Sequence, residues 1–170
     1  VFYDDVKVPI KNLIGEENRG FYYILTALAH ERSFPTGDLR RTFEEFVEYV
    51  KEEGLGDDPL VRQSVAQLAT ELQALQLLAY RVTWLVEKHT SPNWEAPMVK
   101  VYLTEFMWRF SNAATEIMGP YGQLRKGSKW VPLVGRIERL YRHAARRNIS
   151  AGSSEIQRNT IATVGLKLPR

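Results

Sequence analysis

One acidic residue, Glu31, has the sequence surroundings of a proton acceptor. It follows the apolar run 24–29, and Arg32 comes directly after it. Pro35 lies about one turn further on and interrupts or kinks a helix at this point. A carboxylate partly removed from water has a raised pKa and can act as a general base, whereas a neighbouring cation lowers that pKa. The residues alone leave two interpretations open, a general base and an ordinary ion-paired glutamate.

A stripe of arginines is the second candidate site. Five of them follow one predicted helix: Arg136, Arg139, Arg142, Arg146 and Arg147. Such a stripe could contact nucleic acid, the phosphates of a nucleotide or the acidic side chains of a partner subunit. Surfaces that bind nucleic acid interleave aromatic side chains with the cations, and here Tyr141 alone does so, on the side expected to be buried. The sequence favours a solvated or ion-paired surface, keeps a phosphate site as the alternative and disfavours nucleic acid as a partner.

Other kinds of chemistry lack the residues they need. The chain has no cysteine, so it offers no disulfide and no thiolate nucleophile, and a reducing, cytoplasmic compartment is the expectation. None of the three histidines has a second histidine or a carboxylate three or four positions later, as a metal-binding helix would require. Charged residues interrupt every apolar stretch before the roughly 18 residues of a membrane span, and the N-terminus does not resemble a leader.

The elements that must position these residues are helices. The chain has 170 residues, 44% of them hydrophobic, with a net charge of +3, which suits one globular domain. Apolar residues recur at steps of three and four from Phe21 to Val50, with the interruption near Pro35, and again over 61–85 and 99–117. A fourth helical pattern runs from Leu133 to Ala144. This spacing predicts an all-α fold, an antiparallel four-helix bundle.

The two ends of the chain carry shorter elements. Residues 1–10 alternate like a β-strand, and since one strand cannot stand alone, we expect them to be a remnant of a β domain cut elsewhere. We therefore place a domain boundary between residues 1–17 and 18–170. At the other end, Ser154 and Gln157 have the spacing of a capping box for a short fifth helix that ends at Gly165.

The two terminal segments also resemble one known family. The opening FYDDVKVPIKNLIGEENRG and the closing GSSEIQRNTIATVGLKLPR are similar to motifs of the acyl-CoA dehydrogenases, and the similarity spans essentially the whole chain. It implies the C-terminal helical domain of an enzyme that uses FAD to dehydrogenate an acyl-CoA thioester between its α- and β-carbons. In that reaction a glutamate removes the α-proton, while donors hold the thioester oxygen.

The resemblance assigns roles to individual residues. Many relatives carry the glutamate base just before the glycine of the closing motif, where this chain has Ala151. A smaller branch places it before the arginine of the first helix of this domain, which makes Glu31 the candidate base and Arg32 a contact for the CoA end of the substrate. The backbone N–H of Ala151 remains a candidate donor to the thioester oxygen. Ser153 and Glu155 stand where relatives touch FAD, although helix capping alone would also explain the serine.

Three departures accompany the resemblance. A Q-x-x-G-G-x-G segment of relatives also meets FAD; here Gly119 is the retained candidate, while Glu116 replaces the glutamine and suits a pyrophosphate poorly. An R-x-x-F-G segment is replaced by residues 54–59, and an R-D-A sequence reads Arg142-His143-Ala144. The expected partners are acyl-CoA, an electron-transferring flavoprotein or similar acceptor, and family subunits in a homo-oligomer (a tetramer) or hetero-oligomer. A non-catalytic scaffold subunit and a DNA-associated member are the alternatives.

Overall fold

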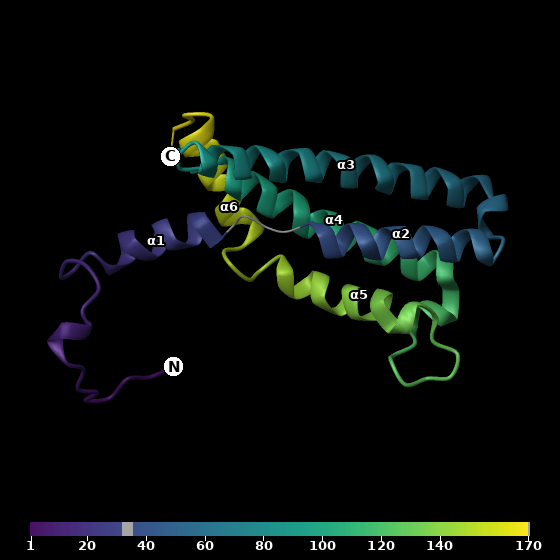
Figure 1. Ribbon diagram of the computed structural model, residues 1–170, viewed down its shortest axis with the longest axis horizontal. Coiled ribbons are helices and arrows are strands. Elements are labelled where there is room, and N and C mark those ends of the chain that lie inside the picture. Colours follow the sequence, from purple (N-terminus) through teal and green to yellow (C-terminus); the bar gives the residue numbers. More distant parts are fainter. Residues whose placement is uncertain (32–35, 170) are drawn as a thin grey trace.

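The computed structural model describes residues 1–31 and 36–169, without the side chains of Ala29, His30 and Glu31. The regular structure of this part of the chain is helical throughout: α1 (Gly20–Glu31), α2 (Gly37–Glu52), α3 (Pro59–Glu87), α4 (Glu95–Met118), α5 (Arg136–Arg147) and α6 (Ser154–Thr160). Helices α2 to α5 form the bundle, in which α3 and α5 run opposite to α2 and α4 (Figure 1). The predicted all-α class, antiparallel four-helix bundle and short C-terminal helix are confirmed.

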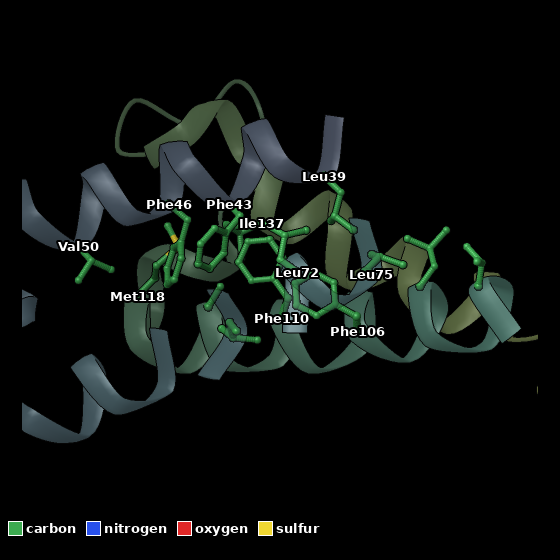
Figure 2. Packing of buried hydrophobic residues seen from close by; sticks show 14 of the residues in the cluster. Leu39, Phe43, Phe46, Val50, Leu72, Leu75, Phe106, Phe110, Met118 and Ile137 are labelled. Atoms are coloured by element: carbon green, nitrogen blue, oxygen red, sulfur yellow. The ribbon is translucent and has the colours of Figure 1, made fainter. Parts of the chain in front are cut away.

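Helix α4 lies at the centre of the bundle, because it packs against α3, α5 and α6. Its Phe110 is fully buried, with Phe43 and Phe46 of α2 meeting it edge-on at 5.6 Å between ring centroids. Phe106, one turn earlier on α4, lies nearly parallel to Phe110 at 5.9 Å (Figure 2). Offset and edge-on ring pairs contribute beyond the area they bury, so this aromatic cluster fixes α2 against α4.

The start of α3 follows the predicted signals. The Asp58 side chain accepts a hydrogen bond from the Leu60 N–H at 2.7 Å, and Pro59 occupies the first helical position. Proline is favoured there because its missing N–H would have no helical partner and its fixed φ suits a helix. The prediction of a helix beginning behind Asp58-Pro59 is confirmed.

The start of α5 differs from the expectation, since the regular helix begins at Arg136 and not directly behind Pro132. Leu133, Val134 and Gly135 have φ values of 50°, 53° and 74°, in the left-handed region. A Cβ on Gly135 would lie 2.7 Å from the backbone nitrogen of Lys126, so the close approach of the chain here requires glycine. Leu133 still packs against the core. The apolar spacing therefore predicted correctly that the Leu133 side chain packs against the core, and wrongly that its backbone is helical.

The N-terminal region also differs from the expectation. Residues 1–9 form no strand, and a single 3-10 turn follows at Ile10–Asn12. The predicted remnant strand is wrong for the described residues, because no segment among them offers a strand edge with which residues 1–9 could pair. Helix α1 extends away from the bundle, and side chains such as Phe21 and Ile24 are exposed (Figure 1). The predicted interruption at Pro35 lies outside the described residues.

The aromatic cluster should control the stability of the bundle. Replacing Phe110 with alanine is expected to lower the free energy of unfolding by about 3–5 kcal/mol, because it leaves a cavity between α2 and α4. Phe21→Ala is the matched control: this side chain is 69% exposed, so the change should stay within about 0.5 kcal/mol. Denaturant unfolding of both variants measures the difference, and equal effects would contradict the described core.

Candidate active site

The connection from α5 to α6 is a closed turn, here called the closing turn and defined as residues 149–153. Its two ends are joined by a hydrogen bond from the Ser154 N–H to the carbonyl oxygen of Asn148, at 3.2 Å. Within it, Ala151 has a φ of 57° and Gly152 a φ of 90°. A left-handed alanine costs roughly 1–2 kcal/mol, so the surrounding contacts must impose this conformation.

Two buried side chains from different helices donate hydrogen bonds to the backbone of the closing turn and of Asn148 before it. Lys100 of α4 is 1% exposed, and its Nζ donates to the same Asn148 oxygen at 3.1 Å. Gln157 of α6 is also 1% exposed, and its Nε2 donates to the carbonyl oxygen of Ala151 at 3.4 Å. Lys100 was not among the residues singled out from the sequence, and Gln157 was expected only as part of a capping box. For Lys100 the available signal was a single lysine inside the apolar run of α4, at a position where helical spacing predicts burial.

The cap of α6 lies one residue earlier than predicted. The Ser153 hydroxyl oxygen accepts from the Ile156 N–H at 3.5 Å, so Ser153 and not Ser154 is the N-cap. The capping box between Ser154 and Gln157 is therefore wrong. Two hydrogen bonds to the Glu155 carboxylate, one from the Ser153 hydroxyl and one from the backbone N–H of Glu155 itself, hold the pKa of Glu155 below its ordinary value. Glu155 is thus an exposed anion beside the closing turn.

Three buried polar atoms next to the closing turn have no hydrogen-bond partner among the described residues. They are Asn148 Oδ1, Ser154 Oγ and Gln157 Oε1. The surrounding protein covers these atoms almost completely, so a cofactor at the surface of the closing turn could not contact them directly. The polar side chains that a cofactor such as FAD could reach at this turn are those of Ser153, which is half-buried, and Glu155, which is exposed.

Gly119 lies at the other end of the bundle. It follows the last residue of α4, whereas Lys100 and the closing turn lie near the first turns of that helix (Figure 1). Lys100 and Gly119 are 19 residues apart, which corresponds to roughly 28 Å along a helix. Glu116, one turn before Gly119, is exposed and has no ion pair within the described ranges. The structure does not bring Gly119 together with Ser153 and Glu155, and the charge at Glu116 fits a cofactor pyrophosphate poorly.

The two residues assigned to proton abstraction and substrate binding are only partly visible. The backbone of Glu31 forms the last residue of α1, and its side chain is not among those described. Arg32 lies outside the described residues. Their assignments stay predictions.

The arginine stripe is partly engaged in ion pairs. Arg136 reaches Glu45 of α2 at 2.9 Å, and Arg142 reaches Glu138 on its own helix at 2.5 Å. A hollow of about 430 Å³ between α2, α4 and α5 is lined by Arg136 together with Arg139, His143 and Arg147. The ion pairs agree with the favoured interpretation of this surface, while the hollow keeps the alternative of a phosphate site.

Two further features complete the description of the surface. No group of three or more His, Cys, Asp or Glu side chains that could hold a metal ion occurs among residues 1–31 and 36–169. In the same ranges no helix combines the length and the apolar composition needed to cross a membrane.

Comparison with known proteins gives one consistent result. Residues 18–166 match the family described as acyl-CoA dehydrogenase, C-terminal domain. Acyl-CoA dehydrogenase FadE26 of Mycobacterium tuberculosis is 30% identical to this chain, over an alignment that covers 99% of this chain and 45% of that protein. Subunit CarC of the caffeyl-CoA reductase-Etf complex of Acetobacterium woodii is 29% identical, over 98% of this chain and 44% of that protein.

The match extends to solved structures. The Tcur3481-Tcur3483 steroid ACAD has a TM-score of 0.92 and 32% identity, with 99% of this chain and 45% of that chain covered. The chain belongs to the acyl-CoA dehydrogenase family, in which it corresponds to the C-terminal helical domain. It spans less than half the length of these relatives.

The pairing of Glu138 with arginines predicts a pH-dependent contribution to stability. Hydrogen bonding from Arg142, helped by Arg125, lowers the pKa of Glu138 below its ordinary value. A carboxylate with a lowered pKa in the folded state stabilises the fold above its unfolded pKa and loses that contribution as the pH falls through the lowered value. Glu138→Gln should therefore cost about 1 kcal/mol at pH 7 and progressively less below pH ~4.

Urea unfolding at several pH values measures this difference. Glu52→Gln is the control, because Glu52 is exposed and forms no ion pair within the described ranges. A cost for Glu138→Gln that stays constant down to pH ~2 would show that the carboxylate is not held ionised by its arginines.

Proposed function

We propose that the protein containing this chain is an FAD-dependent acyl-CoA dehydrogenase that removes hydrogen from the α- and β-carbons of an acyl-CoA thioester. The observation that carries the proposal is the closing turn, in which buried side chains impose a left-handed Ala151 at the start of α6. The closing motif of the family falls on this turn. An alanine methyl group cannot accept a proton, so the base must come from another element.

Glu31 is the residue proposed as that base. Helix α1 ends at Glu31, and this end of α1 and the closing turn lie toward the same end of the molecule (Figure 1). In the proposed step the Glu31 carboxylate takes the proton from the α-carbon, and negative charge develops on the thioester oxygen. The backbone N–H of Ala151 donates a hydrogen bond to that oxygen, which stabilises the charge most when water is excluded.

The cofactor and substrate would be held by residues on both sides of this turn. When bound, FAD supplies the acceptor for the hydride that leaves the β-carbon. Ser153 and Glu155 are the proposed FAD contacts, because both side chains are accessible at the start of α6. Gly119 remains a proposed FAD contact at the far end of α4. Arg32 would contact the adenosine-phosphate end of CoA, since a guanidinium suits a phosphate.

The proposed partners are an electron acceptor and further family subunits. CarC, a relative, is a subunit of a complex that includes Etf, and the solved steroid ACAD carries two chain designations. These names support an electron-transferring flavoprotein or similar acceptor for the present protein, and a homo- or hetero-oligomer of family subunits.

A non-catalytic scaffold subunit is the second candidate. Two observations favour it: Ala151 replaces the usual base, and Glu116 adds an exposed negative charge beside Gly119. In this alternative the chain supplies a bundle face and part of a nucleotide site to an active homologue.

The first candidate predicts that Glu31→Gln abolishes reduction of the flavin by acyl-CoA in the full-length protein, because glutamine cannot accept the α-proton. FAD content should stay unchanged, since Glu31 is not a proposed FAD contact. Anaerobic mixing with substrate, followed by the absorbance of oxidised flavin, measures the rate. Glu87→Gln, an exposed change at the end of α3, is the control. Undiminished reduction by Glu31→Gln would refute the assignment.

The scaffold alternative makes a separate prediction. Full-length protein expressed alone would then carry no FAD, and co-expression with a homologous chain from the same source would yield a complex that contains it. Size-exclusion chromatography with quantification of released flavin distinguishes the two candidates. FAD bound in stoichiometric amount to the protein expressed alone would contradict the scaffold function.

A further inference from the structure

We propose that Lys100 of α4 and Gln157 of α6 are positioning residues, which hold the closing turn so that the Ala151 N–H meets the thioester oxygen. This inference rests on the proposed function, because it concerns the donor to the developing negative charge. The assignment comes from two hydrogen bonds, Lys100 Nζ to the Asn148 oxygen and Gln157 Nε2 to the Ala151 oxygen.

The burial of Lys100 requires an explanation that packing alone does not give. Its side chain is 1% exposed on a helix whose adjacent residues Val99 and Val101 are also buried. Removing an ammonium from water costs several kcal/mol, and an apolar side chain of similar length would fill the same space without that cost. The site therefore uses the charge or the hydrogen bond of the lysine.

The Asn148 carbonyl, one of the groups with which Lys100 interacts, is suited to a cation. Asn148 is the C-cap of α5, so its carbonyl belongs to the negative end of that helix, where ammonium groups are stabilising. The same oxygen accepts the Ser154 N–H that closes the turn. One carbonyl thus joins α4, α5 and α6, and a shift of Lys100 would move both ends of the closing turn.

Gln157 fixes the middle of the same turn. Its bond to the Ala151 oxygen sets the orientation of the peptide unit that follows Ala151, in a residue with φ of 57°. A donor stabilises an oxyanion only at hydrogen-bonding distance from it, and a misplacement of about 1 Å is enough to slow a reaction roughly 100-fold. Lys100 thus anchors the start of the closing turn through Asn148, and Gln157 anchors Ala151 itself.

The test uses the full-length, FAD-loaded protein with Lys100→Met, Lys100→Arg and Gln157→Met, and with Lys88→Met as an exposed control. Lys100→Met is expected to lower the limiting rate of flavin reduction by about 10- to 100-fold, while KM changes less than about threefold. Lys100→Arg keeps the cation and the donor and should recover much of the rate. Gln157→Met should lower the limiting rate in the same direction, by a smaller factor.

A second measurement does not depend on turnover. Hydrogen–deuterium exchange of a peptide that covers residues 148–158 should be about tenfold or more faster in Lys100→Met than in the unaltered protein, because the turn loses a tether. Exchange over α3 should not change. If Lys100→Met does not fold, Gln157→Met carries the same two measurements.

The outcomes separate this inference from the proposed function. A folded Lys100→Met or Gln157→Met protein with unaltered limiting rate overturns the inference, whatever its exchange rate. If Glu31→Gln abolishes flavin reduction in that case, the proposed function stands. Unaltered reduction by Glu31→Gln instead refutes Glu31 as the base, and the rate and exchange of the Lys100 variants still decide the inference. A protein that reduces no flavin in any form overturns both.

Discussion

The carbonyl oxygen of Asn148 accepts the Lys100 ammonium and the Ser154 N–H at once, and the candidate active site depends on these two bonds. Because the donors come from different helices, this single acceptor fixes α4, α5 and α6 relative to one another at one end of the bundle. A left-handed Ala151 is stable there only as long as its flanking residues are held. The conformation of the candidate oxyanion donor is thus determined by groups that lie outside the turn itself.

Helix α4 connects this end of the molecule to the rest of the core. Its aromatic residues pack against α2, and its first turns supply Lys100 to the closing turn. The helix ends at Met118, and Gly119, which follows it, is the second proposed contact with flavin. One helix therefore sets the positions of two candidate cofactor contacts that are far apart.

Much of the fold could be predicted from the sequence, because it follows from spacing and capping. Asp58 and Pro59 marked the start of α3, and the apolar seam of α4 predicted its core residues. The start of α5 could not be predicted in the same way. Leu133 is a partly buried residue at a position that suits a helix, yet it and the next two residues are left-handed where Gly135 approaches the backbone of Lys126 closely. Periodicity records which side chains are buried and is insensitive to the conformation that buries them.

Less of the candidate site than of the fold could be predicted from the sequence. The motifs pointed to the closing turn, but the cap at Ser153 in place of Ser154 depends on where α5 ends in space. The roles of Lys100 and Gln157 depend on contacts across 48 and six residues, which no local pattern encodes. The terminal strand was inferred from alternation alone, and pairing with another strand is a property that one segment does not contain.

The contacts that hold the closing turn and α6 join residues far apart in the sequence, which affects the order in which the domain folds during synthesis. The bond from Lys100 to Asn148 spans 48 residues, and the ion pair between Arg158 and Glu105 spans 53. During synthesis on the ribosome, α2, α3 and α4 can therefore assemble around their phenylalanines well before the residues that complete the closing turn leave the exit tunnel. Within this domain, the end of the bundle that carries the closing turn is therefore completed after the aromatic core, and a chain released early would carry most of that core without the closing turn.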